Sequence, residues 1–311
     1  MSTNRIAVVA AIPPELREVL SRGNELVEVK RGEAPSEGFD VAVTTSIAGA
    51  DTALYDRFPA LRLLLCNGTG LENIDLAEAG RRGIVVRHTP DEVTDDTADF
   101  AIGLIYAVSR RIAEADRFVR AGRWDKERMS PSRRVFDRTL GIVGLGKIGQ
   151  TIARRASGIG MSVLYTGPRE KPDLAYGYVP AIGDLAERCD VLVLSCPGGP
   201  ETHRIVDAAV LERLGPEGIL INVSRGSVVD QEALIAALEK KIIGGAGLDV
   251  FDAEPSIDPR FAGFETVVLA PHYAAVTRET RYGIANTLAQ AAADLRAGRP
   301  VRDAAAAFGK G

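Results

Sequence analysis

Arg225, Glu254 and His272 each stand just beyond one of three apolar segments in the last third of the chain. An imidazole titrates near neutral pH, so His272 suits a general acid and base. A carboxylate such as Glu254, hydrogen-bonded to the imidazole, would favour its protonated form, and the guanidinium of Arg225 would bind a substrate carboxylate. Singly, each residue is compatible with a structural role. Their joint placement predicts proton donation to a carbonyl oxygen on a molecule that also carries a carboxylate.

A glycine-rich turn, Gly144-Leu-Gly-Lys-Ile-Gly149, follows an apolar run and precedes the helical pattern of residues 150–156. Glycines at this spacing permit a tight turn and close approach of the backbone to a diphosphate at a helix N-terminus. The same spacing also fits an ordinary turn, but its place between strand and helix predicts a dinucleotide site. Its predicted contacts are Gly144, Gly146, Lys147, Ile148 and Gly149. Together with the three polar residues, the turn predicts hydride transfer between a nicotinamide coenzyme and a 2-oxoacid.

The loop after the next apolar run bears on the choice of coenzyme. An NAD site usually has an acidic residue at a strand end about 20 residues after the glycines. Here no acidic residue stands at the strand end, and beyond Gly167 the chain continues with Arg169, Glu170 and Lys171. Because cations suit the additional phosphate of NADP, we predict a preference for NADP(H), with NAD(H) as the second coenzyme. The alternative is that both cations are solvated loop charges.

Two series of short apolar runs must position these residues, and helical patterns alternate with them. The first series contains residues 6–10, 40–44, 61–66 and 84–86. The second contains six runs, at residues 140–144, 163–165, 191–194, 219–223, 245–250 and 267–270. This alternation predicts an α/β fold with parallel sheets and crossover helices.

Two longer helical patterns lie outside these series. Residues 96–121 form an amphipathic segment that we predict to be one interdomain helix, ending at Gly122. Residues 279–297 predict a further helix that returns to the first domain. The six runs between these two segments fit one doubly wound unit.

The composition excludes several function classes. The chain has 311 residues, 46% of them hydrophobic, and a formal net charge of -4 from 38 basic and 42 acidic side chains that are well mixed. This balance gives no basic stripe for nucleic acid or anionic lipid, and we expect no nucleic-acid or membrane partner. The short apolar run near the N-terminus is too brief for a signal segment, which predicts a cytoplasmic protein. Three cysteines and three dispersed histidines lack ligand spacing, so we expect reduced thiols and no metal.

These motifs together resemble the D-isomer-specific 2-hydroxyacid dehydrogenases. The likeness runs over nearly the whole chain and is carried by residues 141–149, 222–230, 245–251, 254–255 and 271–272. Residues 70–75, 89–104 and 196–202 most resemble the glyoxylate and hydroxypyruvate reductase branch of the family.

The resemblance implies an architecture and further contacts. Residues 1–96 and 277–311 would form a flavodoxin-like substrate domain, with a Rossmann NAD(P)-binding domain of residues 97–276 inserted into it and a homodimer built around the latter. The backbone amides of Thr69 and Gly70, with the Ser46-Ile47 loop opposite, would hold the substrate carboxylate. The additional coenzyme contacts expected on this basis are Thr97, Cys196, Pro197, Thr202, Val223, Ser224 and Asp249.

Two departures from the family pattern concern the substrate. Thr69 stands where the branch commonly has valine, and Tyr273 follows the histidine where a small or aliphatic residue is usual, so we predict that Tyr273 lines the substrate pocket. The leading prediction is an NADPH-preferring reductase that converts glyoxylate or hydroxypyruvate to the D-2-hydroxyacid. The alternatives are an aromatic 2-oxoacid reductase acting on phenylpyruvate or hydroxyphenylpyruvate, and a nucleotide-sensing interaction protein of the corepressor type.

Overall fold

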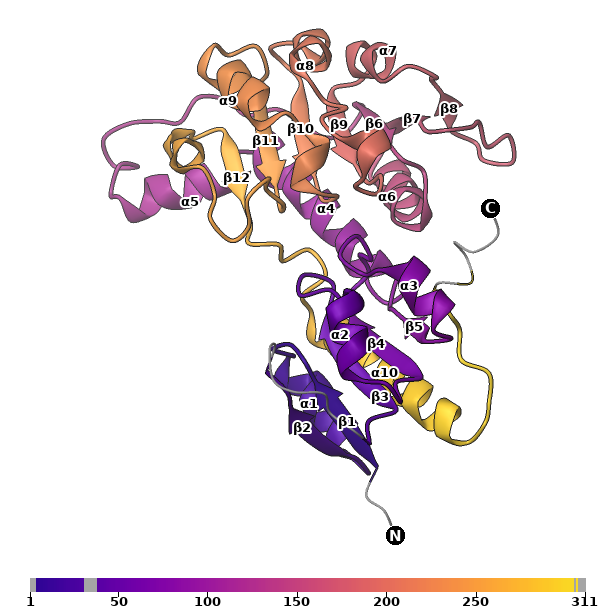
Figure 1. The fold of residues 1–311 in the computed structure, drawn as a ribbon. Coiled ribbons are helices and arrows are strands. Elements are labelled where there is room, and N and C mark those ends of the chain that lie inside the picture. The colour runs from indigo at the N-terminus through magenta and orange to yellow at the C-terminus, as the bar shows by residue number, and fades with distance from the viewer. Residues whose placement is uncertain (1–3, 31–37, 305, 307–311) are drawn as a thin grey trace. The chain divides into compact units, whose positions relative to one another are not determined.

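The computed structural model describes residues 4–30, 38–304 and 306, and the chain divides into two compact units (Figure 1). The first unit comprises Met1–Val93 with Val276–Gly311, and the second comprises Thr94–Ala275. The chain therefore passes from one unit to the other close to the expected boundaries at 96/97 and 276/277.

The described residues of the first unit form a five-stranded parallel sheet in the order β2-β1-β3-β4-β5. Its strands are β1 (Arg5–Val8), β2 (Glu25–Glu28), β3 (Val41–Thr45), β4 (Leu63–Asn67) and β5 (Val85–Arg87). This is the flavodoxin-like order. Strand β2 was not predicted, because it is a short edge strand with an exposed glutamate at each end and only two apolar residues between them.

Helices cover both faces of this sheet. On one face α1 (Pro14–Ser21) and α10 (Arg278–Arg296) bury apolar side chains that include Leu16 and Leu288. On the other face lie α2 (Thr52–Arg57) and α3 (Leu76–Arg81). The C-terminal helix thus belongs to the first unit, as its sequence pattern predicted.

The second unit contains a seven-stranded parallel sheet in the order β12-β11-β10-β9-β6-β7-β8 among its described residues. Its strands are β6 (Thr139–Val143), β7 (Ser162–Thr166), β8 (Gly177–Tyr178), β9 (Val191–Leu194), β10 (Ile219–Asn222), β11 (Gly245–Leu248) and β12 (Val267–Leu269). Counted from β6, the order is that of a Rossmann sheet with one strand added. The prediction of two doubly wound sheets is confirmed. The strand beyond that order is β12. Strand β8 was not predicted, because its two residues are too few to give a sequence pattern.

The helices of the second unit separate into two layers, which Figure 1 shows on either side of the strands. The apolar sides of α4 (Thr94–Ser109) and α6 (Lys147–Gly158) enclose one core. The opposite core lies beneath α7 (Ile182–Glu187), α8 (Ala208–Leu214) and α9 (Gln231–Glu239). Three short 3-10 helices, η1 (Pro200–Thr202), η2 (Gly226–Val228) and η3 (Pro259–Gly263), lie in the connections.

The predicted single helix over residues 96–121 is wrong. Helix α4 ends at Ser109, and a second helix, α5, covers Ile112–Arg120. Between them Arg111 adopts a left-handed backbone with φ 52°, which no α-helix can contain without a break. The carbonyl of Ser109 instead accepts a hydrogen bond from the backbone N–H of Arg133 at 3.1 Å. The apolar pattern continues on both sides of Arg111, so the sequence pattern did not indicate the break between the two helices.

Candidate active site

Three neighbouring strands of the second unit present the residues of the predicted catalytic set. Strands β10, β11 and β12 are adjacent and parallel, so the loops that follow them emerge at one edge of the sheet. Arg225 lies in the loop after β10, Glu254 in the loop after β11, and His272 just after β12. The sheet topology thus gathers at one edge three residues that are far apart in the sequence.

Glu254 and His272 form a direct side-chain pair. One carboxylate oxygen of Glu254 lies 2.7 Å from Nδ1 of His272. The other accepts a hydrogen bond from the backbone N–H of Phe251 at 3.0 Å, which fixes the carboxylate in its own loop. The side chain of His272 remains 47% exposed. Because Glu254 occupies Nδ1, Nε2 is the ring nitrogen left to meet a substrate.

The turn that carries His272 is held by Asp249, which is almost completely buried. The backbone at His272 has φ 54°, a left-handed conformation that is uncommon for a side-chain-bearing residue. The two oxygens of Asp249 accept hydrogen bonds from the backbone N–H groups of Tyr273 at 2.6 Å and Ala274 at 3.0 Å. Burial raises the pKa of this carboxyl group, and the two N–H donors oppose that rise. Asp249 was expected to contact the coenzyme; the structure shows its anchoring bonds, and the coenzyme contact stays a prediction.

The loop of Arg225 approaches the loop of Glu254 at Gly226. A Cβ added to Gly226 would lie 1.9 Å from the carbonyl carbon of Phe251, so only glycine fits there. The amide of Asn222 donates to the carbonyl of Arg225 at 3.0 Å and accepts from the N–H of Ser224 at 3.0 Å. These contacts hold the Arg225 backbone in place beside the β11 loop.

The glycine-rich turn has the geometry of a dinucleotide-binding turn. Gly144 has φ 92°, and a Cβ there would come within 2.7 Å of the backbone of Cys196. A Cβ at Gly149 would lie 2.2 Å from the carbonyl oxygen of Gly144. Gly146 caps α6 and has open space where its Cβ would stand. The residues fit a coenzyme diphosphate, because the two crowded glycines fold the turn tightly while the third leaves its outer side free.

The other expected coenzyme residues occupy the same unit. Arg169 is exposed and makes no hydrogen bond or ion pair with any described residue, whereas the ammonium of Lys171 lies 2.6 Å from the carbonyl oxygen of Leu145. Cys196 and Ser224 are joined by a hydrogen bond from the serine hydroxyl to the cysteine carbonyl. The remaining expected contacts are Thr97 in α4, Lys147 and Ile148 at the start of α6, Gly167, Pro197, Thr202 and Val223.

The expected substrate loops of the first unit follow strands β3 and β4. The side-chain amide of Asn73 donates to the carbonyl oxygens of Ser46 at 3.0 Å and Ile47 at 3.3 Å. This leaves the side chain of Ile47 78% exposed. Asn73 was not singled out from the sequence, because its role depends on a loop 26 residues away in the chain.

His88 supports the neighbouring loop of Thr69. Its Nδ1 lies 3.0 Å from the carbonyl oxygen of Thr69, and since a carbonyl only accepts, Nδ1 carries the hydrogen. Burial lowers the pKa of His88, which favours the neutral ring. The hydroxyl of Thr69 in turn donates to the carbonyl of Thr89 at 3.2 Å. Residues 68–70 are therefore held by polar contacts from the segment after β5.

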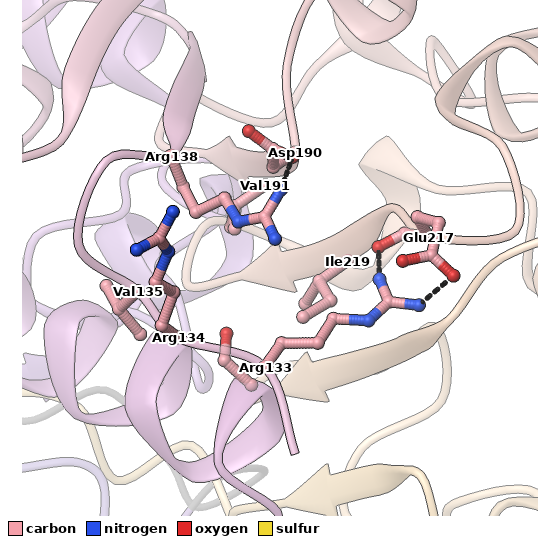
Figure 2. Close-up of a pocket in the computed structure, with 9 residues that line it drawn as sticks. Arg133, Arg134, Val135, Arg138, Asp190, Val191, Glu217 and Ile219 are labelled. Carbon is pink, nitrogen blue, oxygen red and sulfur yellow. Dashed lines mark hydrogen bonds and ion pairs between the residues drawn. The ribbon is translucent and has the colours of Figure 1, made fainter. Parts of the chain in front are cut away.

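A small pocket in the second unit, away from the predicted catalytic residues, is lined largely by charged side chains (Figure 2). It lies at the amino-terminal ends of β6, β9 and β10, the sheet edge opposite to the glycine-rich turn. Arg138 pairs there with Asp190 at 3.0 Å, and Arg133 pairs with Glu217 at 2.6 Å. Because these charges compensate one another, the pocket is not a candidate coenzyme or substrate site.

No group of three or more histidine, cysteine, aspartate or glutamate side chains arranged to hold a metal ion occurs in the described part of the chain. Among the same residues, no helix combines the length and apolar character needed to cross a bilayer.

Comparison with known proteins identifies the family. Residues 102–274 match the model of the D-isomer specific 2-hydroxyacid dehydrogenase NAD-binding domain. Glyoxylate/hydroxypyruvate reductase A of Arabidopsis thaliana is 43% identical over 244 residues, 78% of either chain. Hydroxyphenylpyruvate reductase of Plectranthus scutellarioides is 42% identical over 246 residues, 79% of either chain.

A solved structure extends the likeness to the whole fold. The NADPH-dependent glyoxylate/hydroxypyruvate reductase of Sinorhizobium meliloti, in complex with NADP and malonate, superposes with a TM-score of 0.87 at 36% identity, covering 95% of this chain and 94% of that one. The chain therefore belongs to the D-isomer-specific 2-hydroxyacid dehydrogenase family, in its glyoxylate/hydroxypyruvate reductase branch. It is an NAD(P)-dependent oxidoreductase that reduces 2-oxoacids.

Proposed function

We propose that this protein is an NADPH-preferring reductase of small 2-oxoacids, glyoxylate and hydroxypyruvate, and forms the D-2-hydroxyacids. The observation that carries the proposal is the 2.7 Å contact between Glu254 and His272 at the sheet edge that also bears Arg225. This arrangement supplies a proton donor with a carboxylate behind it and a cation for the substrate carboxylate.

The roles of the three residues follow from their chemistry. Arg225 binds the substrate carboxylate and polarises the adjacent carbonyl. His272 donates the proton on Nε2 to the carbonyl oxygen, and Glu254 stabilises the imidazolium before that step. When bound, the nicotinamide supplies the hydride that adds to the carbonyl carbon. In the reverse direction His272 accepts the proton from the hydroxyl group.

Two observations support the coenzyme preference. Strand β7 ends at Thr166 without a carboxylate, and the exposed guanidinium of Arg169 follows it. The reductase of Sinorhizobium meliloti, which shares the fold, is named NADPH-dependent. Arg169 would then bind the 2′-phosphate, with the ammonium of Lys171 in the same loop.

The first unit would serve as the substrate domain and the second as the coenzyme domain. The amides of Thr69 and Gly70, with the loop of Ser46 and Ile47 opposite, would hold the substrate carboxylate. Tyr273, which is 50% exposed and packs edge-on against Phe100 at 6.3 Å, would line the pocket.

We also propose a cytoplasmic homodimer built on the second unit. Four large apolar side chains of this unit are exposed over α5 and the segment that follows it: Ile112, Val119, Trp124 and Phe136. Such a group would be costly to leave in water, and a second copy of the chain would cover it. Light scattering at micromolar concentration would measure the mass, and a monomer would contradict the dimer without affecting the proposed reaction.

The decisive experiment measures initial rates with glyoxylate, hydroxypyruvate, pyruvate and phenylpyruvate, each with NADPH and with NADH. We expect the highest kcat/KM for the first two with NADPH. Turnover only of phenylpyruvate would favour the aromatic alternative, which the likeness to hydroxyphenylpyruvate reductase supports. Failure of all four substrates would contradict the proposed substrate class and favour the corepressor-type alternative.

A further inference from the structure

Two tyrosine hydroxyls hold residues 167–171, the first half of the loop between β7 and β8. The hydroxyl of Tyr165 accepts a hydrogen bond from the backbone N–H of Lys171 at 2.7 Å. The hydroxyl of Tyr178 donates to the carbonyl oxygen of Gly167 at 3.1 Å. The short segment that carries Arg169 is thereby fixed at its first and last residues.

The two tyrosines form one rigid support. Tyr165 and Tyr178 are paired across the parallel strands β7 and β8, and their rings lie 5.3 Å apart. Tyr165 is only 1% exposed and belongs to the core beneath α4 and α6. The hydroxyls therefore stand on the sheet itself, and their positions are set by core packing rather than by the loop.

Lys171 ties the same loop to the glycine-rich turn. Its ammonium lies 2.6 Å from the carbonyl oxygen of Leu145, the residue between Gly144 and Gly146. A cation that binds this carbonyl holds the loop beside the turn where the coenzyme diphosphate is expected. Arg169 is left as the exposed cation of the segment, without an ion pair to any described residue.

We propose that Tyr165, Tyr178 and Lys171 are positioning residues that set coenzyme specificity by holding Arg169 where the 2′-phosphate of NADP(H) binds. The inference rests on the proposed preference for NADPH. A loop that is ordered before binding loses less conformational entropy when it engages a ligand, so the fixed loop strengthens binding of the phosphate. NAD(H) has a hydroxyl in place of that phosphate, and its binding should depend little on the loop.

The test measures equilibrium binding of two fragments that lack nicotinamide, adenosine 2′,5′-bisphosphate and AMP, by calorimetry. Tyr165→Phe and Tyr178→Phe each remove one neutral hydrogen bond. Each should raise the Kd of the bisphosphate about fivefold and change the Kd of AMP less than about twofold. Tyr176→Phe is the matched control, because Tyr176 lies in the same segment and makes no hydrogen bond to a described residue. Thermal melting of each variant shows that the fold is retained.

Arg169→Ala distinguishes the proposed NADPH preference from the proposed positioning role of the tyrosines. If Arg169→Ala weakens binding of the bisphosphate selectively and neither Tyr→Phe variant changes that binding, the positioning role is overturned and the NADPH preference stands. Equal losses of both fragments in Arg169→Ala would overturn the preference itself. Equal losses of affinity for both fragments in the tyrosine variants would show that the tyrosines have a general structural role, and would also overturn the positioning role. Lys171→Met should resemble the tyrosine variants, with a larger loss of the bisphosphate.

Discussion

The two units fix their functional loops in different ways. In the second unit, the pair of Glu254 and His272 links ionisable side chains from two strand ends. In the first unit, Asn73 and His88 hold the loops of Ser46 and Thr69 through neutral hydrogen bonds to backbone carbonyls. The ionisable pair of the second unit suits the proposed proton transfer, whereas the contacts of the first unit hold the shape of its loops. Substitutions in the second unit should therefore lower kcat, and those in the first should raise KM.

The largest effect is expected at His272. His272→Asn removes the proposed proton donor, and kcat should fall about 10²- to 10⁴-fold. Coenzyme binding, measured by fluorescence titration, should stay within about twofold because the glycine-rich turn is untouched. The control is His203→Asn, an exposed histidine of the same unit. An unchanged kcat in His272→Asn would remove this residue from the mechanism. It would also contradict the expectation that substitutions in the second unit lower kcat.

A smaller effect is expected at Glu254. Glu254→Gln keeps a hydrogen-bond acceptor opposite His272 and removes the carboxylate charge that the proposed mechanism uses. Loss of a charge-assisted hydrogen bond costs about 1.5–3 kcal/mol, which corresponds to a fall in kcat of about 10- to 150-fold. Steady-state rates of Glu254→Gln and Glu254→Asp provide the comparison, since the aspartate retains the charge. Asp252→Asn, in the same exposed loop, serves as the control. Equal kcat values for the glutamine variant and the unaltered enzyme would show that the carboxylate only shapes its loop.

The smallest effect is expected at His88. His88→Leu removes the donor to Thr69, and the KM for the 2-oxoacid should rise about fivefold with kcat within about twofold. His88→Asn places an amide N–H near the position of Nδ1 and should restore the KM. A fall in kcat with unchanged KM in the leucine variant would mean that the first unit contributes to the chemical step, and the two units would then not differ in this way.

Much of the fold could be predicted from short-range signals. The alternating apolar runs identified β1, β3, β4 and β5 and the six longer strands of the second unit, because strands buried on both faces are continuously apolar. The glycine-rich turn was predicted because backbone crowding at Gly144 and Gly149 permits no other residue. Strand β2 and the break at Arg111 were missed, since an edge strand needs few apolar residues and the break leaves the amphipathic pattern intact.

The sequence by itself determined which chemical groups are present and which strands they follow, and this was enough to choose Arg225, Glu254 and His272 as candidates. Only the tertiary structure decided which atoms meet. The carboxylate of Asp249 turns to the backbone of residues 273 and 274, Asn73 reaches back to the Ser46 loop, and two tyrosine hydroxyls fasten the segment around Arg169. Spacing along a chain fixes the edge at which a loop emerges, whereas a hydrogen bond depends on side-chain direction over a few ångströms, which packing alone sets.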